Sequence, residues 1–255
     1  MADYDTIAAG YESRVVPKFR PIAERLAALA GLGPGDHVLE LGAGTGGLSR
    51  LVVPRIESGG HLVLLDISTG MLQVAAQVLR DAGHKNSTCL VHDLATLPFL
   101  DEEFDLVLCN LGYLEESQRA VHEAFRVLRR GGRLAIAIWG PLTTHNEWAI
   151  LRVARRELGL TTQFVPPVGD VIKRLTRAGF TRLTRRHEEF TVIHRDVDAY
   201  VSYRESFPWR AIVATPVSQS RYLARLRYEA ERRAGPDGRL AIRWSVTFLM
   251  ARRGE

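Results

Sequence analysis

The sequence predicts an α/β protein built on a doubly wound, mostly parallel sheet of seven strands with a helical cap. Short apolar runs alternate with helical patterns as far as Trp139, which favours parallel strands joined by helices. The runs are apolar almost throughout, as expected for strands that helices cover on both faces. A glycine-rich loop follows the first run, at the strand end where doubly wound sheets bind ligands.

The individual elements follow from the same patterns. A first helix is expected over Pro21–Ala30, because proline suits the first turn of a helix and glycines interrupt the pattern afterwards. The expected strands are His37–Gly42, His61–Ser68, Ser87–Asp93, Phe104–Asn110, Arg133–Trp139, one within Phe180–Ile193, and Arg243–Arg252. The later helices are expected from the glycine loop to about Ile56 and over Thr69–Ala82, Glu116–Arg129, Glu147–Leu158 and Val168–Ala178.

One long stretch departs from this alternation. Tyr200–Ala234 is helical in pattern, rich in aromatic residues and broken at Pro208 and Pro216. It lies between the last two expected strands, so we expect it to form an inserted cap over the sheet.

Composition and charge narrow the class of protein. The chain has 255 residues, 46% of them hydrophobic and 25% charged, which is ordinary for a globular protein. The net charge of +5 comes almost entirely from arginines spread along the chain, whereas a nucleic-acid-binding protein more often clusters them. No apolar stretch of about 18 residues occurs, so no membrane span is expected.

The cysteines and the first residues suggest a location. Cys89 and Cys109 both lie inside apolar runs and are expected to be buried free thiols in a reducing compartment. The opening MADYDTIAAGYESR is acidic and lacks the apolar core of a signal peptide. We therefore expect a cytoplasmic protein.

The glycine loop, VLELGAGTGGLS, is compatible with two cofactors. From Gly42 it fits the dinucleotide pattern G-x-G-x-x-G, and from Glu40 it fits E-x-G-x-G-x-G. Glycines let the backbone approach a ligand closely, and Asp66, after the second strand, can accept hydrogen bonds from both ribose hydroxyls. These roles suit NAD and S-adenosylmethionine equally, because both contain adenosine.

Four successive strands end in polar groups, which is more specific than the loop alone. They are Glu40, Asp66, Asp93 and Asn110. An ionised Glu40 would repel a pyrophosphate and attract an ammonium or sulfonium cation, and Asp93 can accept a hydrogen bond from an exocyclic amine of adenine. Alternatively, Glu40 caps a nearby amide and Asp93 begins a turn. Their occurrence at consecutive strand ends favours the binding role and S-adenosylmethionine.

These residues resemble the class I S-adenosylmethionine-dependent methyltransferases, of the broad group that includes ubiquinone and menaquinone methyltransferases. The matching segments are VLELGAGTGGLS, LVLLDISTGML, HDLATLPFLDEEFDLVLCN and HEAFRVLRRGGRLAIAIWG. They cover His37–Gly140 in the family's order. The resemblance implies a Rossmann-like methyltransferase fold whose last strand runs antiparallel beside the sixth.

The resemblance also implies a division of the chain. Residues 1–30 would form lid helices, because YDTIAAGYESR is similar to the family's N-terminal segment that closes over the cofactor. Residues 31–195 and 236–255 would form the cofactor-binding core. Residues 196–235 would form a helical cap insertion over the acceptor pocket.

Carried over by motif, the resemblance implies a set of cofactor contacts. Those around the methionine part are Glu40, Gly42, Ala43, Gly44 and Gly46. Asp66 binds the ribose, Ile67 and Met71 lie against the adenine, and Asp93 and Leu94 contact its edge. Asn110 and Leu111 line the wall near the sulfonium, and Tyr11 lies on the lid side.

Catalytic groups are less evident. Many relatives carry His-His where this chain has Gly112-Tyr113, and an unperturbed tyrosine is a poor base at neutral pH. Tyr113 can still orient an acceptor by hydrogen bonding, or simply pack against the cap. His145 follows the fifth strand and is a candidate base, although a loop histidine without a role is the simpler interpretation. The histidines lack metal-ligand spacing, so no metal is expected.

The expected function is methyl transfer from S-adenosylmethionine to oxygen, nitrogen or carbon of a small organic molecule, with secondary metabolism as the suggested context. The Asn-Pro-Pro-Tyr type of motif that acts on nucleobases or amides is replaced by CNLGY. The expected partner is a small-molecule acceptor, with no nucleic acid and no membrane, and the expected state is a monomer or homodimer. Two alternatives stay open: a cyclisation or other non-methylating step on the same fold, and an NAD-dependent oxidoreductase.

Overall fold

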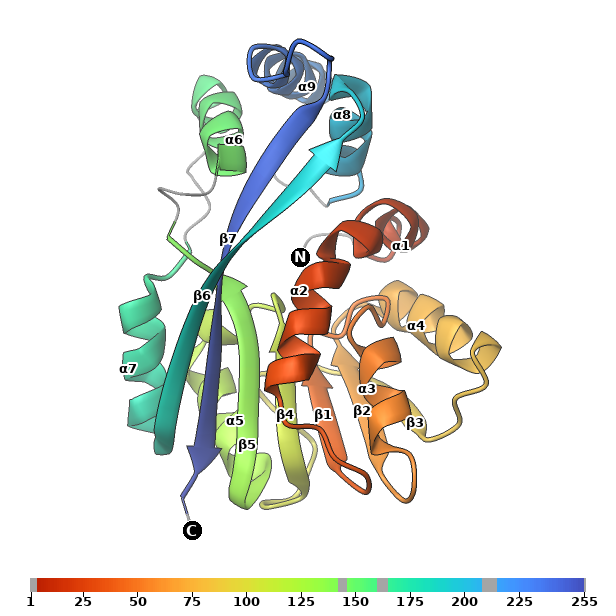
Figure 1. The fold of residues 1–255 in the computed structure, drawn as a ribbon, viewed down its shortest axis with the longest axis vertical. Coiled ribbons are helices and arrows are strands. Elements are labelled where there is room, and N and C mark those ends of the chain that lie inside the picture. Colours follow the sequence, from red (N-terminus) through yellow and green to blue (C-terminus); the bar gives the residue numbers. More distant parts are fainter. Residues whose placement is uncertain (1–3, 142–145, 160–164, 208–214, 255) are drawn as a thin grey trace.

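The computed structural model describes residues 4–141, 146–159, 165–207 and 215–254. They form one sheet of seven strands, ordered β3-β2-β1-β4-β5-β7-β6 (Figure 1). The strands are β1 His37–Leu41, β2 His61–Asp66, β3 Ser87–Val91, β4 Phe104–Asn110, β5 Leu128–Trp139, β6 Phe180–His194 and β7 Leu240–Arg253. The first five strands are parallel, and β7 pairs antiparallel with both β5 and β6. The predicted seven-stranded, mostly parallel sheet is confirmed.

Helices cover both faces of the sheet, because alternate strand residues point to opposite sides. On one face, Val38 and Leu106 pack with α2 Val16–Leu29, α3 Ser49–Ile56 and α4 Thr69–Asp81. On the other, Leu39 and Val107 pack with α5 Gln118–Val127 and α7 Val168–Ala178. Two apolar cores therefore fix the central strands and the positions of their carboxyl ends.

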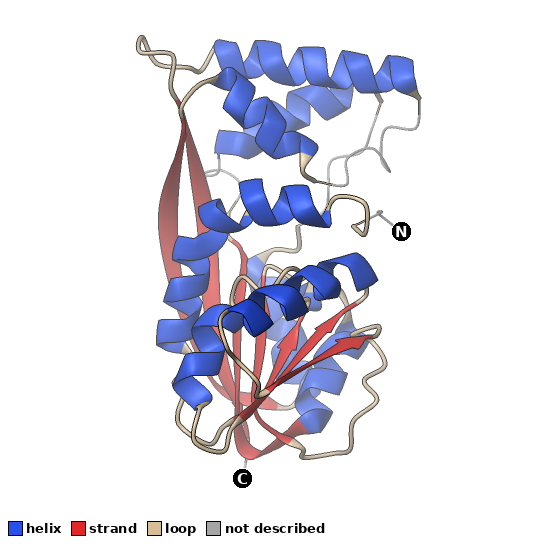
Figure 2. Ribbon diagram, turned by 90° about the vertical axis from the view of Figure 1, so that its right-hand side faces the viewer, coloured by secondary structure: helices blue, strands red, loops and turns tan. Residues whose placement is uncertain are grey.

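Three helices gather beyond the carboxyl ends of the parallel strands (Figures 1 and 2). They are α6 Asn146–Glu157, α8 Val197–Glu205 and α9 Pro216–Glu231. β5 stops pairing with β7 at Trp139 and Val246, whereas β6 and β7 stay paired as far as His194 and Leu240. The two long strands thus form a ribbon that reaches the helices. α6 packs against α9 there, so α6 lies with the residues expected to form the cap.

Two sequence expectations need correction. Cys89 is only half-buried, because β3 is an edge strand and one side of it lacks a neighbour, whereas Cys109 in β4 is buried as expected. The helix expected from Pro21 already begins at Val16, where Pro17 occupies the first turn and Pro21 lies inside the helix.

Among the described helices, none is both long and apolar enough to cross a membrane.

Candidate functional site

The glycine loop after β1 makes close contact with the loop after β4. Gly42 has φ +66°, and a Cβ placed on it would lie 2.8 Å from Cα of Gly112. Gly44 has φ +55°, and its N–H donates a 2.8 Å hydrogen bond to Oδ2 of Asp66. Gly42 is required both by its backbone conformation and by the lack of space for a Cβ, whereas Gly44 is required by its conformation alone.

Asp66 lies at the end of β2, facing this loop. Its Oδ1 accepts a 3.0 Å hydrogen bond from the Ser68 amide, while Oδ2 is held by Gly44. Burial raises the pKa of Asp66 above its ordinary value, against the lowering effect of these backbone hydrogen bonds. The carboxylate is therefore held in one orientation, with lone pairs left for a ligand.

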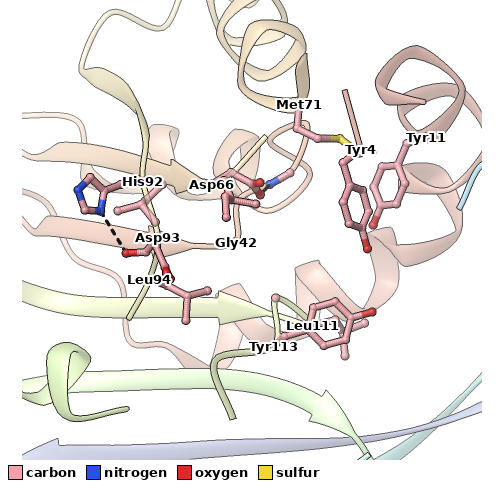
Figure 3. Close-up of a pocket in the computed structure, with 14 residues that line it drawn as sticks. Tyr4, Tyr11, Gly42, Asp66, Met71, His92, Asp93, Leu94, Leu111 and Tyr113 are labelled. Atoms are coloured by element: carbon pink, nitrogen blue, oxygen red, sulfur yellow. Dashed lines mark hydrogen bonds between the residues drawn. The ribbon is translucent and has the colours of Figure 1, made fainter. Parts of the chain in front are cut away.

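Asp66 opens into a cavity of about 780 Å³, which we call the Asp66 cavity (Figure 3). It contains ten of the predicted site residues together with four others. The lining residues are Tyr4, Tyr11, Gly42, Gly44, Leu65, Asp66, Ile67, Met71, His92, Asp93, Leu94, Leu111, Gly112 and Tyr113. The structure thus brings together residues from the ends of four strands and from the N-terminal segment.

Glu40 lies in β1 and is buried. Its Oε2 accepts a 2.6 Å hydrogen bond from the Ser49 hydroxyl. Burial, reinforced by the charge of Asp66, raises the pKa of Glu40 to about 8 despite this hydrogen bond. The carboxyl group is therefore largely protonated near neutrality, in contrast to the ionised form suggested by the sequence, and a nearby cation would favour ionisation.

Glu40 lines a second cavity of about 510 Å³, the Glu40 cavity, which shares Tyr11, Gly42, Gly44 and Leu111 with the first. Its other lining residues are Val16, Phe19, Arg20, Ala23, Glu40, Ala43, Thr45, Gly47, Leu48 and Asn110. Within the described part of the chain, Oδ1 of Asn110 is buried and lacks a hydrogen-bond partner. A buried acceptor of this kind is an available contact for a ligand.

Gly46 is the one described member of the predicted cofactor set that lines neither cavity. A Cβ at this position would lie 3.2 Å from Cβ of Ala75, so the glycine permits close packing of the loop against α4. Its neighbour Gly47 lines the Glu40 cavity instead.

Asp93 was expected either to contact a ligand or to begin a turn, and the structure places it both in a turn and in the lining of the Asp66 cavity. Its Oδ1 accepts a 2.8 Å hydrogen bond from the Ala95 amide, which is the turn given as the alternative to binding. It also lines the Asp66 cavity, next to His92, whose Nδ1 lies 3.1 Å from the carbonyl oxygen of Asp93. His92 directly follows β3 and belongs to the cavity wall.

The N-terminal segment closes one side of the site through two carboxylates missed in the sequence. Asp5 accepts hydrogen bonds from the Ser68 hydroxyl at 2.6 Å and the Gly70 amide at 2.7 Å. Glu12, in α1 Ala8–Arg14, accepts from the Thr45 hydroxyl at 2.6 Å and pairs with Arg50 at 3.0 Å. The acidic character of the opening segment was the available signal.

Two tyrosines of this segment project into the Asp66 cavity, as Figure 3 shows. Burial, with the neighbouring Tyr113, raises the pKa of both Tyr4 and Tyr11 above the ordinary value. Both therefore remain protonated and available as donors. Tyr4 was not predicted.

The two catalytic candidates have different outcomes. His145 lies outside the described residues. Tyr113 has φ +64° and lines both the Asp66 cavity and a third cavity of about 440 Å³ beneath α6 and α8. Among the described side chains, no group of three His, Cys, Asp or Glu could hold a metal ion.

Comparisons with known proteins point to methyltransferases. Residues 38–132 match the family model described as "Methyltransferase domain". The chain is 37% identical over 110 residues to the ubiquinone/menaquinone biosynthesis C-methyltransferase UbiE of Vibrio vulnificus, covering 42% of each chain. It is 37% identical over 157 residues to the malonyl-[acyl-carrier protein] O-methyltransferase of Methylococcus capsulatus, covering 60% of this chain and 54% of the relative. The match thus spans about half the length of these curated relatives.

Solved structures share the fold. The YcgJ protein of Bacillus subtilis superposes with a TM-score of 0.65 at 15% identity, covering 92% of this chain and 99% of that one. The [4+2]-cyclase SpnF superposes with a TM-score of 0.62 at 19% identity, covering 92% and 80%.

Proposed function

We propose that this chain is a class I S-adenosylmethionine-dependent methyltransferase, as its similarity to methyltransferases supports, and that it transfers the methyl group of S-adenosylmethionine to a small organic molecule. One observation carries the proposal: Glu40, Asp66, Asp93 and Asn110 come from four successive strand ends and line two cavities that share the glycine loop. Such a loop alone fits other nucleotides, whereas this set of polar groups fits an adenosine joined to a cationic amino acid.

In this proposal, the Asp66 cavity holds the adenosine. Asp66 accepts hydrogen bonds from the ribose hydroxyls, and Ile67, Met71 and Leu94 provide apolar contacts for the adenine. Asp93 is assigned to the adenine edge; its place in the cavity lining and its second carboxylate oxygen, which lies beyond the one in its turn, support this assignment.

The Glu40 cavity holds the methionine part. Glu40 and the unpaired oxygen of Asn110 supply acceptors for the ammonium group, and the loop glycines allow the close approach. When bound, S-adenosylmethionine supplies a methyl group already activated by its sulfonium. The chain contributes alignment and exclusion of water, and Tyr113 stands where the cofactor and acceptor regions meet.

We extend the proposal to the organisation of the chain. Residues 1–30 act as a lid, because Asp5 and Glu12 fasten the N-terminal segment to α4 and to the glycine loop. Residues 196–235, joined by α6, act as the cap over the acceptor region. The acceptor itself is a small molecule, such as the quinones suggested by the name of one curated relative. The name of the other relative suggests a malonyl group carried on a protein as the alternative.

Calorimetric titration with S-adenosylmethionine tests the first half of the proposal. We expect saturable binding in the micromolar range, and no binding at millimolar concentration would contradict it. Titration with NADH, followed by energy transfer from the tryptophans, tests the oxidoreductase alternative in the same sample.

A second candidate function is a non-methylating step on the same fold, such as a cyclisation. It is favoured by the presence of a tyrosine, Tyr113, rather than a histidine in the position between cavities, and by the likeness in fold to SpnF, a [4+2]-cyclase. Formation of S-adenosylhomocysteine on turnover with host metabolites separates the two functions, since only methyl transfer produces it.

A further inference from the structure

The third cavity, which we call the cap cavity, has an unusual composition. Six of its nine described lining residues carry aromatic rings: Phe19, Tyr113, Trp139, Trp148, Tyr203 and Phe207. The other three are Leu151, Glu147 and Arg204. Flat ligands pack well between aromatic rings, so the shape and chemistry of this wall favour a planar molecule.

The cap cavity is placed to receive the molecule that reacts with the cofactor. It shares Tyr113 with the Asp66 cavity and Phe19 with the Glu40 cavity. Glu147 and Arg204, in contrast, line the cap cavity but neither of the other two. The charged pair therefore belongs to the cap cavity alone, whereas Tyr113 and Phe19 form its border with the cofactor region.

Glu147 and Arg204 form a pair of buried charges that contact aromatic residues. The side chains of Glu147 and Arg204 are 4% and 14% exposed, and their Oε1 and Nη1 atoms lie 3.3 Å apart. Glu147 also accepts a 2.8 Å hydrogen bond from the indole N–H of Trp244. The guanidinium of Arg204 lies 4.5 Å above the ring of Phe207.

The pair is incompletely hydrogen-bonded. The 3.3 Å contact is long for a charge-assisted hydrogen bond, and within the described residues Nε of Arg204 is buried without a partner. Burying such donors is costly unless a partner completes them. One carboxylate and one guanidinium side by side complement a hydroxyl, which donates to the first and accepts from the second.

We propose that the cap cavity binds a planar aromatic acceptor by its hydroxyl group, with Arg204 and Glu147 as positioning residues that determine specificity. The hydroxyl donates to Glu147 and accepts from Arg204, while the ring packs against the aromatic residues of the lining, among them Trp139, Trp148 and Phe207. The opposite edge of the ring is then directed toward Tyr113 and the cofactor region. This inference rests on the proposed function only in naming the ligand an acceptor.

The test uses two probes that differ by one hydroxyl, 5-hydroxyindole and indole. Each is titrated by calorimetry into the full chain saturated with S-adenosylhomocysteine. We expect 5-hydroxyindole to bind about tenfold or more tightly than indole, because its hydroxyl forms charge-assisted hydrogen bonds in a buried site. Equal affinities, or no binding of 5-hydroxyindole at about 10 mM, would overturn the proposal.

Removing one member of the pair would leave an unpaired buried charge and endanger folding. The variant is therefore Glu147→Gln combined with Arg204→Met, which removes both charges and keeps an acceptor for Trp244. We expect it to bind indole as the wild type does and to lose the preference for 5-hydroxyindole. A preference that persists in this variant would contradict the assignment.

A cofactor titration separates this inference from the proposed function. Both proteins are titrated with S-adenosylmethionine, whose cavities do not include the pair. Loss of cofactor binding in the wild type would refute the proposed function. If both proteins bind the cofactor normally but the wild type shows no preference for 5-hydroxyindole over indole, the inference alone is refuted.

Discussion

At the scale of single residues, Asp66 is held by backbone hydrogen bonds on both of its carboxylate oxygens. Backbone amides on two loops fix its two oxygens, at 2.8 Å from Gly44 and 3.0 Å from Ser68. A carboxylate positioned in this way needs no reorganisation when it accepts further hydrogen bonds. Its contribution to binding should therefore be large for a single side chain.

We predict that Asp66→Ala weakens S-adenosylmethionine binding about 10- to 100-fold, because hydrogen bonds to a charged group contribute about 1.5–3 kcal/mol. Calorimetry measures the change. The matched control is Asp170→Ala, which removes an exposed carboxylate of α7 that pairs with Lys173. Equal affinity in the two variants would remove Asp66 from the site.

Glu40 leads to a prediction about pH. Its pKa is raised to about 8 by burial and by the charge of Asp66, so below this pH a cationic ligand must displace a proton in order to meet an ionised carboxylate. The bound state has the lower pKa, and affinity should therefore rise with pH until the ligand's own ammonium group, with an ordinary pKa of about 7.7–8.0, begins to lose its proton.

Calorimetry at about pH 6 and about pH 7.5, where the ligand's ammonium still largely keeps its proton, should show tighter binding of S-adenosylmethionine at the higher pH, with proton release detectable at the lower pH in buffers of different ionisation enthalpy. In Glu40→Gln the contribution of this group to the pH dependence should vanish. A wild-type profile as flat as that of the variant would show that Glu40 does not titrate on binding.

At the scale of elements, the side chains of Asp5 and Glu12 connect the N-terminal segment to the site through hydrogen bonds. Asp5 accepts two hydrogen bonds from the start of α4, and Glu12 accepts one from the glycine loop and one from Arg50 in α3. A segment held in this way can open without disturbing the sheet. It should therefore control the exchange of the cofactor.

We predict that Asp5→Asn combined with Glu12→Gln speeds dissociation of S-adenosylmethionine about tenfold, with a smaller effect on association. Stopped-flow displacement by sinefungin measures the rate. Glu24→Gln, which removes an exposed pair with Arg20 on α2, is the control. If both variants release the cofactor at the same rate, the N-terminal segment is not a lid.

The element boundaries show where sequence patterns were sufficient. Phe104–Asn110 and Val168–Ala178 were predicted to the residue, because apolar periodicity and flanking glycines or turns define both ends. β5 begins five residues earlier than expected. The Gly131-Gly132 pair suggested a turn before the strand, whereas the strand continues through these glycines and forms a bulge. Leu128 pairs with Phe104 and Arg133 with Leu106 on either side of that bulge.

At the scale of the whole molecule, the sequence predicted the part of the site that lies at the strand ends. Glu40, Asp66 and Asn110 each end or nearly end a parallel strand, so their meeting at one edge follows from topology. The cap cavity could not be found in this way. It joins Phe19, Trp148 and Arg204, which come from helices far apart in the chain, and such tertiary contacts leave no local pattern.

The arrangement of the three cavities also predicts where binding should stabilise the chain. The Asp66 and Glu40 cavities involve the N-terminal segment, the glycine loop and the start of α4, whereas α9 lines neither and packs against α6 and α8. S-adenosylmethionine should therefore stabilise the N-terminal segment, the glycine loop and the start of α4 against local opening, and leave α9 unchanged.

Hydrogen exchange measured by mass spectrometry tests this directly. On addition of saturating S-adenosylmethionine, peptides covering residues 4–14 and 41–50 should exchange at least about tenfold more slowly, while peptides within Pro216–Glu231 should keep their rates. Peptides of α7, on the opposite face of the sheet from the lid helices, provide the internal control. Equal protection of α9 and the N-terminal segment would mean that lid and cap respond as one body, so that cofactor binding alone would also close the cap cavity.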